Sequence, residues 1–99
     1  MNIGKAIKLC RSQRSMTQAE LAKRSDLSVG YVSLLEQNKR DPSLSMLESI
    51  ARGLEVPMSI LTFLAADRHE LANLSDDLHE KLSRAALDLL KEPSSGFLL

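Results

Sequence analysis

The sequence contains little that would point to a secreted or membrane-bound protein. Among its 99 residues there is a single cysteine, which excludes an internal disulfide bond. There is no apolar leader region and no long uncharged hydrophobic run, so we expect neither a signal peptide nor a membrane span. The chain is therefore expected in the cytoplasm.

Motifs for catalysis and cofactor binding are also lacking. There is no glycine-rich phosphate loop and no Ser/His/Asp set. His69 and His79 lie ten residues apart without a cysteine partner, so no metal site is expected. Cys10 falls where a core aliphatic side chain is expected and is predicted to be a buried, unreactive thiol. We expect a protein that is not an enzyme and holds no metal or cofactor.

A surplus of positive charge, usual in nucleic-acid-binding proteins, is missing from the whole chain but not from its first half. Residues 1–53 contain nine Lys or Arg and five Asp or Glu, whereas residues 54–99 contain four and eight, so the halves carry +4 and −4. This asymmetry indicates a basic module followed by an acidic tail. The alternative is an uneven scatter of solvated surface charges.

The remaining composition is that of a small helical protein. With 43% hydrophobic and 26% charged residues, the chain is expected to fold, and its length suggests one domain with an appended helix. No alternating run reaches strand length, which predicts an all-α fold. We place the domain at residues 1–66 and a helical extension at residues 67–99. The Pro-Ser-Ser-Gly stretch at residues 93–96 predicts a flexible end.

Capping residues and apolar spacing divide the domain into five short helices. An apolar stripe predicts a first helix over residues 3–14. Thr17 and Glu20 form a capping box that starts a second helix, over residues 17–25. The same reasoning predicts further helices over residues 28–37, 43–54 and 58–66. The fourth helix is expected to bury Leu44, Leu47, Ile50 and Ala51 on one side.

The second and third helices are joined by a tight turn, as in the unit that places its second helix in a DNA major groove. Asp26 suits this turn because Asp tolerates the left-handed backbone conformation. With Gln18 counted as the first position, small Ala22 falls at position five, where the two helices approach closely. The apolar residues at positions four, fifteen and eighteen should pack against the first helix: Leu21, Val32 and Leu35.

Three segments, TQAELA, YVSLLEQNKRDPS and LESIARGLEVP, occur in this order within residues 3–64. In sequence and separation they resemble the Cro/CI-type (XRE) family of helix-turn-helix DNA-binding domains. The resemblance implies the five-helix lambda-repressor-like fold, sequence-specific binding to double-stranded operator DNA, usually as a dimer, and commonly repression. Ser15 and Asp26 stand where the family often has glycine, which bears on the turn geometry.

The resemblance also assigns DNA-binding residues. Those that it places on the groove-facing side of the recognition helix are Ser28, Val29, Gly30, Ser33, Leu34 and Gln37. Those that it places at phosphates are Gln18, Asn38, Lys39 and Arg40. Helix amides and cations suit phosphate oxygens, which position the protein without reading sequence. Tyr31 either adds a phosphate contact through its hydroxyl or packs its ring over the edge of the domain.

Two of the groove-facing residues depart from the family pattern. Relatives often carry Gln at the positions of Val29 and Leu34, and neither side chain here can form the bidentate hydrogen bonds by which Gln reads adenine. We expect readout through contacts to thymine methyl groups, through Ser33 and Gln37, and through DNA shape. The alternative is that Val29 and Leu34 form a protein-binding patch.

Ser75 predicts the start of a sixth helix, whose continuous apolar stripe needs a partner. The stripe consists of Leu78, Leu82, Ala85, Ala86, Leu89 and Leu90. It either folds back on the fifth helix or pairs with its copy in a homodimer. We favour the dimer, because two recognition helices reading half-sites about 34 Å apart gain affinity and specificity. The leading hypothesis is a dimeric operator-binding repressor; the alternative is an antitoxin or interaction module that holds a protein partner through this helix.

Overall fold

The structure, a computed structural model, describes residues 1–66 and 75–90. This part of the chain contains six helices and no strand: α1 (Ile3–Gln13), α2 (Gln18–Arg24), α3 (Val29–Glu36), α4 (Leu44–Leu54), α5 (Met58–Ala65) and α6 (Asp76–Leu89). The all-α fold is therefore confirmed, and the predicted ends of the first five helices differ from the observed ones by at most one residue. The expected flexible end falls on residues 91–99, outside the described part.

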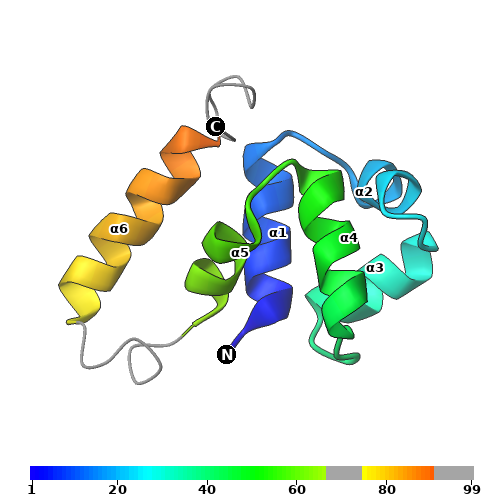
Figure 1. The fold of residues 1–99 in the computed structure, drawn as a ribbon, viewed down its shortest axis with the longest axis horizontal. Coiled ribbons are helices and arrows are strands. Elements are labelled where there is room, and N and C mark those ends of the chain that lie inside the picture. Colours follow the sequence, from blue (N-terminus) through cyan, green and yellow to red (C-terminus); the bar gives the residue numbers. More distant parts are fainter. Residues whose placement is uncertain (67–74, 91–99) are drawn as a thin grey trace.

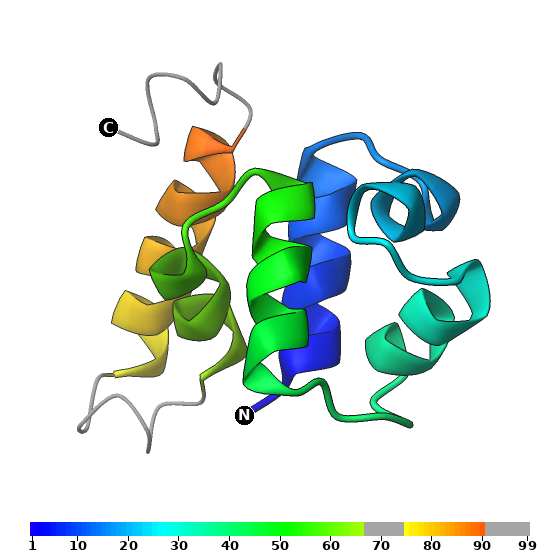
Figure 2. The ribbon, with the colours of Figure 1, turned by 45° about the vertical axis from the view of Figure 1, so that its right-hand side comes forward.

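Helix α1 lies at the centre of the molecule. Figure 1 shows α4 beside it, α2 and α3 on one side, and α5 and α6 on the other. The turned view in Figure 2 keeps α5 and α6 together on the side away from α3. The core between these helices is made of side chains with no exposed surface: Ile7, Cys10, Leu21, Leu35, Ile50, Leu54 and Leu61. The helix-turn-helix pair and α6 are thus attached to opposite sides of one core.

Hydroxyl side chains begin four of the helices. Thr17, Ser28, Ser43 and Ser75 each accept a hydrogen bond from the backbone amide three residues later. At Thr17 the bond is reciprocal, because its own amide donates to Glu20 Oε1 over 3.1 Å. The bond from the Thr17 amide is the largest cause that lowers the pKa of the Glu20 carboxyl, and the interaction of that carboxyl with the Thr17 hydroxyl is the second. The predicted capping box is present, so local sequence suffices to set these helix starts.

Four of the described helices end in the same way, without glycine. A left-handed residue follows each of them, directly after α4 and one residue further on after α1, α2 and α3, with φ of 53° at Ser15 and 58° at Asp26, Asn38 and Glu55. The amides of this residue and the next donate back to carbonyls of the last helical turn, as in a Schellman motif. The prediction for Asp26 is confirmed. Ser15 takes the same conformation, so both turns adopt the left-handed backbone without glycine.

Two residues that the sequence predicted to face the core, Cys10 and Leu44, differ in how far they are buried. Cys10 has no exposed surface, as predicted, and burial raises the pKa of its thiol to about 12. The expectation that Leu44 is buried is wrong, because its side chain is 69% exposed. Leu47 is half-buried and Ile50 fully buried, so the apolar face of α4 is covered progressively along the helix. Leu44 and Ser45, the first two residues of α4, are exposed, whereas Met46 and Leu47 already pack against the core.

Replacing Ser15 with glycine should stabilise the protein by about 1 kcal/mol, because a β-carbon is unfavourable in the left-handed conformation. The midpoint of urea unfolding, followed by circular dichroism, measures this effect. Asn38→Gly is the control: it changes another left-handed residue, where Asn is tolerated better than Ser, and it removes the hydrogen bond that the Asn38 side chain accepts from the Gly4 amide. It should give no gain. A Ser15→Gly midpoint at or below that of the wild type would contradict the prediction.

Candidate nucleic-acid interface

The helix-turn-helix pair is positioned by the buried sides of α2 and α3. Leu21 and Ala22 of α2 and Val32 and Leu35 of α3 are all buried, as predicted from their positions in the sequence. In addition, the β-carbon of any other residue at Gly4 would collide with the carbonyl oxygens of Leu35 and Glu36. The start of α1 therefore packs directly on the end of α3, which directs the opposite face of α3 to solvent.

That outward face is formed by most of the residues assigned to the groove. Val29 is 47% exposed, and Leu34 and Gln37 are exposed as well. A β-carbon at Gly30 would meet no atom within 4 Å, so packing does not require glycine at this position. Glycine leaves the backbone of α3 open to close approach by another molecule. The structure thus brings these four residues together on one accessible helix face.

Ser33 and Gln37 are linked on this face. The Gln37 side-chain amide donates a hydrogen bond to Ser33 Oγ over 2.8 Å, across one helical turn. This bond uses one of the two amide hydrogens, so the second hydrogen and the amide oxygen of Gln37 stay available. A fixed amide of this kind matches the donor and acceptor pair that adenine presents in the major groove.

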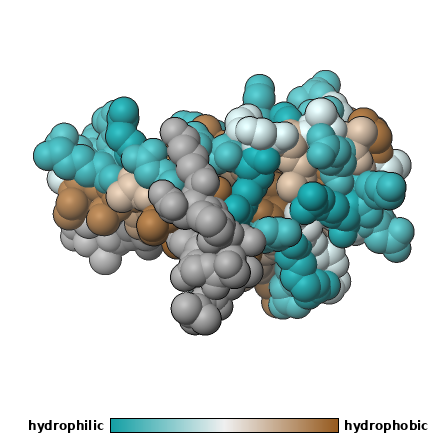
Figure 3. All heavy atoms as spheres, turned by 90° about the horizontal axis from the view of Figure 1, so that it is seen from above, coloured by the Kyte–Doolittle hydropathy of each residue, from teal (hydrophilic) through white to brown (hydrophobic). Residues whose placement is uncertain are grey.

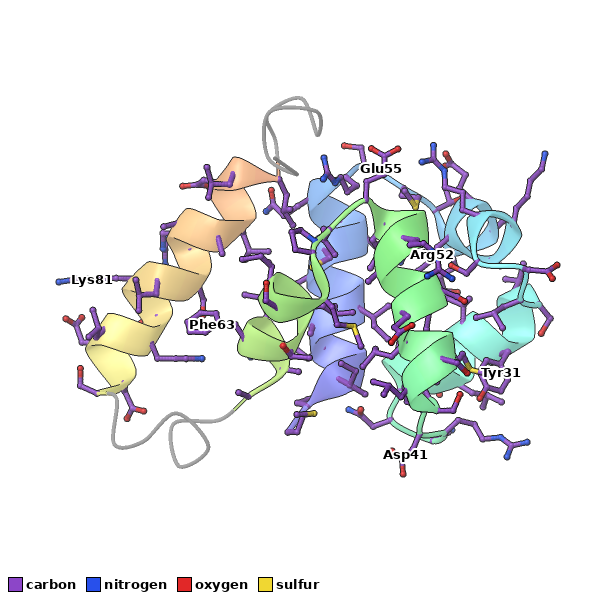
Figure 4. The ribbon with its side chains drawn as sticks, in the orientation of Figure 1. Tyr31, Asp41, Arg52, Glu55, Phe63 and Lys81 are labelled. Carbon is purple, nitrogen blue, oxygen red and sulfur yellow. The ribbon has the colours of Figure 1, made fainter. Side chains whose placement is uncertain are left out.

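Ser28 and Tyr31 lie at the start of α3. The Ser28 hydroxyl accepts a hydrogen bond from the Tyr31 amide over 3.1 Å and so caps the helix. The Tyr31 ring is half-buried and packs against the core, beside the first turn of α4 in Figure 4. Its side chain therefore lies in the packed position foreseen from the sequence, and a phosphate contact by its hydroxyl stays a prediction.

The four residues assigned to phosphates differ in what else they do. Lys39 and Arg40 are exposed in the loop between α3 and α4. The Asn38 side chain instead accepts from the Gly4 amide over 3.1 Å and donates to Asn2 Oδ1 over 2.8 Å. The Gln18 amide donates to Glu36 Oε1 over 3.1 Å. Asn38 and Gln18 thus hold the helix pair together, and each keeps one amide hydrogen for another acceptor.

Glu36 is the centre of a buried polar network that the sequence reasoning missed. Its carboxylate receives Arg11 Nε at 2.7 Å and Arg11 Nη2 at 3.0 Å, while Arg11 Nη1 donates to the Met16 carbonyl over 2.8 Å. The Glu36 side chain is only 4% exposed. These hydrogen bonds raise the pKa of the Arg11 guanidinium. The one available signal was that Arg11 lies four residues after Ile7, on the apolar side of α1.

Helix α6 divides the six residues assigned to a dimer interface. Ala86 and Leu90 are 7% and 2% exposed, because they pack inside the chain against the side formed by α1 and α5. Leu78, Leu82, Ala85 and Leu89 remain exposed. The fold-back alternative thus describes one face of α6, and a second apolar face stays uncovered within the chain. Figure 3 shows apolar side chains gathered along this end of the molecule.

Two further features bear on the kind of site. Within residues 1–66 and 75–90, no three His, Cys, Asp or Glu side chains are grouped closely enough to hold a metal ion. No helix in the same residues combines the length and the hydropathy that a bilayer span requires.

Comparison with known proteins locates the similarity in the same helices. A family model described as helix-turn-helix matches residues 7–61. An immunity repressor protein of Bacillus phage phi105 is 29% identical over 102 residues, covering 98% of this chain and 71% of that protein. A competence pilus inhibition repressor of Acinetobacter baylyi is 31% identical over 77 residues, covering 78% and 70%.

Two other proteins extend the comparison. The transcriptional regulator ClgR of Mycobacterium tuberculosis is 27% identical over 66 residues, covering 67% of this chain and 59% of that protein. Among solved structures, the wild-type restriction-modification controller protein C.Esp1396I matches with a TM-score of 0.55 and 28% identity, covering 87% of this chain and 90% of that one. The last match extends beyond the five-helix domain, so it includes part of the extension.

Arg11→Met should lower the free energy of unfolding by about 3 kcal/mol, because it leaves the buried Glu36 carboxylate without its cation. Urea unfolding measures this loss, and adding Glu36→Leu should restore part of it, so that the double variant is less destabilised than the sum of the two single ones. Arg24→Met is the matched control, since Arg24 pairs with Glu55 where both side chains are nearly half exposed. It should cost less than about 1 kcal/mol. Equal losses for Arg11→Met and Arg24→Met would show that the network does not hold the helix pair.

Proposed function

The chain belongs to the XRE-type helix-turn-helix family, and we propose that it is a repressor that binds operator DNA as a dimer through α3. The family model describes a helix-turn-helix, and the similar proteins are named as repressors, a transcriptional regulator and a controller protein. The observation that carries the proposal is the division of α3 into two faces. Val32 and Leu35 anchor one face in the core, and the opposite face presents Val29, Gly30 and Leu34 to solvent.

In the proposed complex α3 lies in the major groove. Val29 and Leu34 contact thymine methyl groups, and the open backbone at Gly30 allows the helix to approach the base edges. Gln37, held by Ser33, reads one base pair through its free amide atoms. Ser28 lies at the end of α3 that enters the groove first. This arrangement favours DNA over the protein-binding alternative for Val29 and Leu34. The reason is that the Gln37 amide, fixed by Ser33 on the same face, matches the donor and acceptor pair of a base.

Phosphate contacts are proposed at both edges of this face. Lys39 and Arg40 provide exposed cations on the loop between α3 and α4, which suits sequence-independent attraction to the DNA backbone. Gln18 and Asn38 each offer the amide hydrogen that their contacts within the protein leave free. Because these two side chains are already fixed, their contacts would define the register of the protein on the duplex. Tyr31 is proposed to add its hydroxyl at the same edge.

The proposed dimer uses the exposed face of α6. Leu78, Leu82, Ala85 and Leu89 follow one another at intervals of four, three and four residues, the spacing by which two helices pack side by side. The three leucines are 43 to 49% exposed, more than a helix of this kind tolerates without a partner. A twofold axis at α6 would place two copies of α3 on successive half-sites.

The alternative, an antitoxin or interaction module, uses the same face of α6 for another protein. The relatives described above are named as repressors, regulators and a controller protein. We therefore propose regulation of transcription as the function and a second copy of the chain as the partner of α6.

Duplexes selected from random DNA by the wild-type chain separate readout from phosphate contact. Gln37→Ala should relax preference at one base pair by about 1–3 kcal/mol and leave binding to random DNA nearly unchanged. Arg40→Ala should weaken binding to selected and random DNA alike and reduce the salt slope by about one unit. Fluorescence anisotropy at several salt concentrations measures both. If the two variants lost affinity equally on both kinds of DNA, the proposed division of roles would be wrong, and no salt-dependent binding by the wild type would refute the function.

Leu82→Asp should convert the dimer to a monomer, because it places a carboxylate in the centre of the exposed apolar face of α6. Sedimentation equilibrium measures the mass, and anisotropy should show at least a tenfold loss on a two-half-site duplex with half-site binding unchanged. Arg84→Ala is the matched control, since the Arg84 side chain is exposed and pairs only with Glu80 in the described residues. A wild type that is monomeric on and off DNA, or a Leu82→Asp variant that is still dimeric, would exclude this interface.

A further inference from the structure

The C-terminal ends of α1, α4 and α6 meet at one end of the molecule, the top in Figure 1. The last carbonyl groups of a helix have no partner within it, and the aligned peptide dipoles make that end partly negative. Three such ends close together favour a donor that carries positive charge. The labelled Glu55 in Figure 4 marks this position at the end of α4, next to the end of α1.

Arg14, the residue that caps α1, supplies that donor. Its Nε donates to the Leu54 carbonyl over 3.0 Å, its Nη2 donates to the Glu55 carbonyl, and its Nη1 donates to the Leu90 carbonyl over 3.0 Å. A single guanidinium thus joins α1, α4 and α6. Its planar fork can direct three donors to three fixed oxygens, whereas a lysine ammonium is a single point charge on a flexible stem.

The contacts that hold α6 are strongest at the same end. Ala86 and Leu90, in its last turns, are buried. In its first half the His79 ring lies 5.4 Å from the Phe63 ring, but His79 Nε2 is buried without a hydrogen-bond partner in the described residues, as is Ser83 Oγ at the middle of the helix. Such atoms weaken the attachment of α6 ahead of its last turns. The direction of α6 is therefore determined mainly at its C-terminal end, where Arg14 lies.

We infer that Arg14 is a positioning residue that fixes the angle of α6 to the DNA-binding helices and thereby sets which half-site spacing the dimer accepts. This inference rests on the proposed function. Helices α3 and α6 lie at opposite ends of a molecule whose longest extent is 37 Å. Over this lever, a tilt of roughly 10° at α6 moves α3 by about 6 Å, which exceeds the rise of one base pair, about 3.4 Å. Arg14 itself contacts no DNA in this arrangement.

The first test measures the angle without DNA. Spin labels on Lys23→Cys in α2 and Arg84→Cys in α6, in chains diluted with unlabelled protein, report the distance by double electron–electron resonance. The buried Cys10 stays unlabelled in the folded protein. We expect a narrow distance distribution in the otherwise wild-type chain and a broad one after Arg14→Ala. Arg14→Lys should be intermediate. Equal widths in all three chains would overturn the inference whether or not the protein binds DNA.

The second test measures spacing on DNA. The probes are a half-site selected from random DNA and duplexes that carry two copies of it at centre-to-centre spacings around one helical turn, about 10–10.5 base pairs. The wild type should bind its preferred spacing at least tenfold more tightly than spacings shifted by a few base pairs. Arg14→Ala should bind the half-site within about twofold of the wild type and lose most of that preference.

Two further variants control for misfolding and for the loss of charge. Leu90→Ala releases the same end of α6 while leaving Arg14 bonded to α4, so it should relax the spacing preference as Arg14→Ala does. Arg24→Ala removes an exposed cation whose side chain pairs with Glu55 at the end of α4, and it should keep the preference. A preserved preference in Arg14→Ala or Leu90→Ala overturns the inference. If the wild type bound DNA only as a monomer, the proposed dimeric function would be wrong. The spin-label distance measurement would still test whether Arg14 fixes the angle of α6.

Discussion

The orientation of the helix-turn-helix pair depends on one buried ion pair. Arg11 and Glu36 join the end of α1 to the end of α3. Gln18, at the start of α2, donates to the same carboxylate, and Arg11 donates to the Met16 carbonyl in the loop between α1 and α2. Burying a charge is unfavourable unless it is paired and hydrogen-bonded, and in this network the carboxylate has three donors. Apolar packing alone would allow α3 to slide on the core, whereas directed charge-assisted bonds define one position. The outward face of α3 is accessible because its inward face is held in this way.

Arg11 and Arg14 lie in the last turn and cap of the same helix, but they serve different parts of the molecule. Arg11 holds the helix-turn-helix pair through Glu36, and Arg14 bonds to the carbonyls at the ends of α4 and α6. The central helix α1 thus carries both attachments. The exposed face of α3 and the exposed face of α6 are therefore both positioned relative to α1, which forms a common frame for them. Polar side chains with contacts inside the protein, such as Gln18 and Asn38, belong to this frame as well as to the proposed interface. The side chains of Lys39 and Arg40 are exposed and belong to the proposed interface.

Much of the fold was predictable because its determinants are local. A hydroxyl residue followed by helix-forming residues caps a helix wherever it occurs, and the starts at Thr17, Ser28, Ser43 and Ser75 followed from that. The helix ends were predictable to within a residue although Ser15 and Asp26 replace glycine, since neighbouring backbone hydrogen bonds impose the left-handed conformation. Burial was less predictable where the end of a helix extends beyond the helices packed against it. Leu44, at the start of α4, lies on the apolar side of the helix but is exposed. The groove-facing set came from family resemblance, and Val29, Gly30, Leu34 and Gln37 do share one exposed face.

The sequence by itself determined the helices, their caps and the alternation of buried and exposed positions, because these depend on residues within a few positions of one another. Only the tertiary structure decided that Arg11 pairs with Glu36, that Arg14 reaches Leu90, and that α6 buries Ala86 while leaving Leu82 exposed. These contacts join residues far apart in the chain, and a side chain's partner there depends on how whole helices pack. No periodicity within a single helix contains that information.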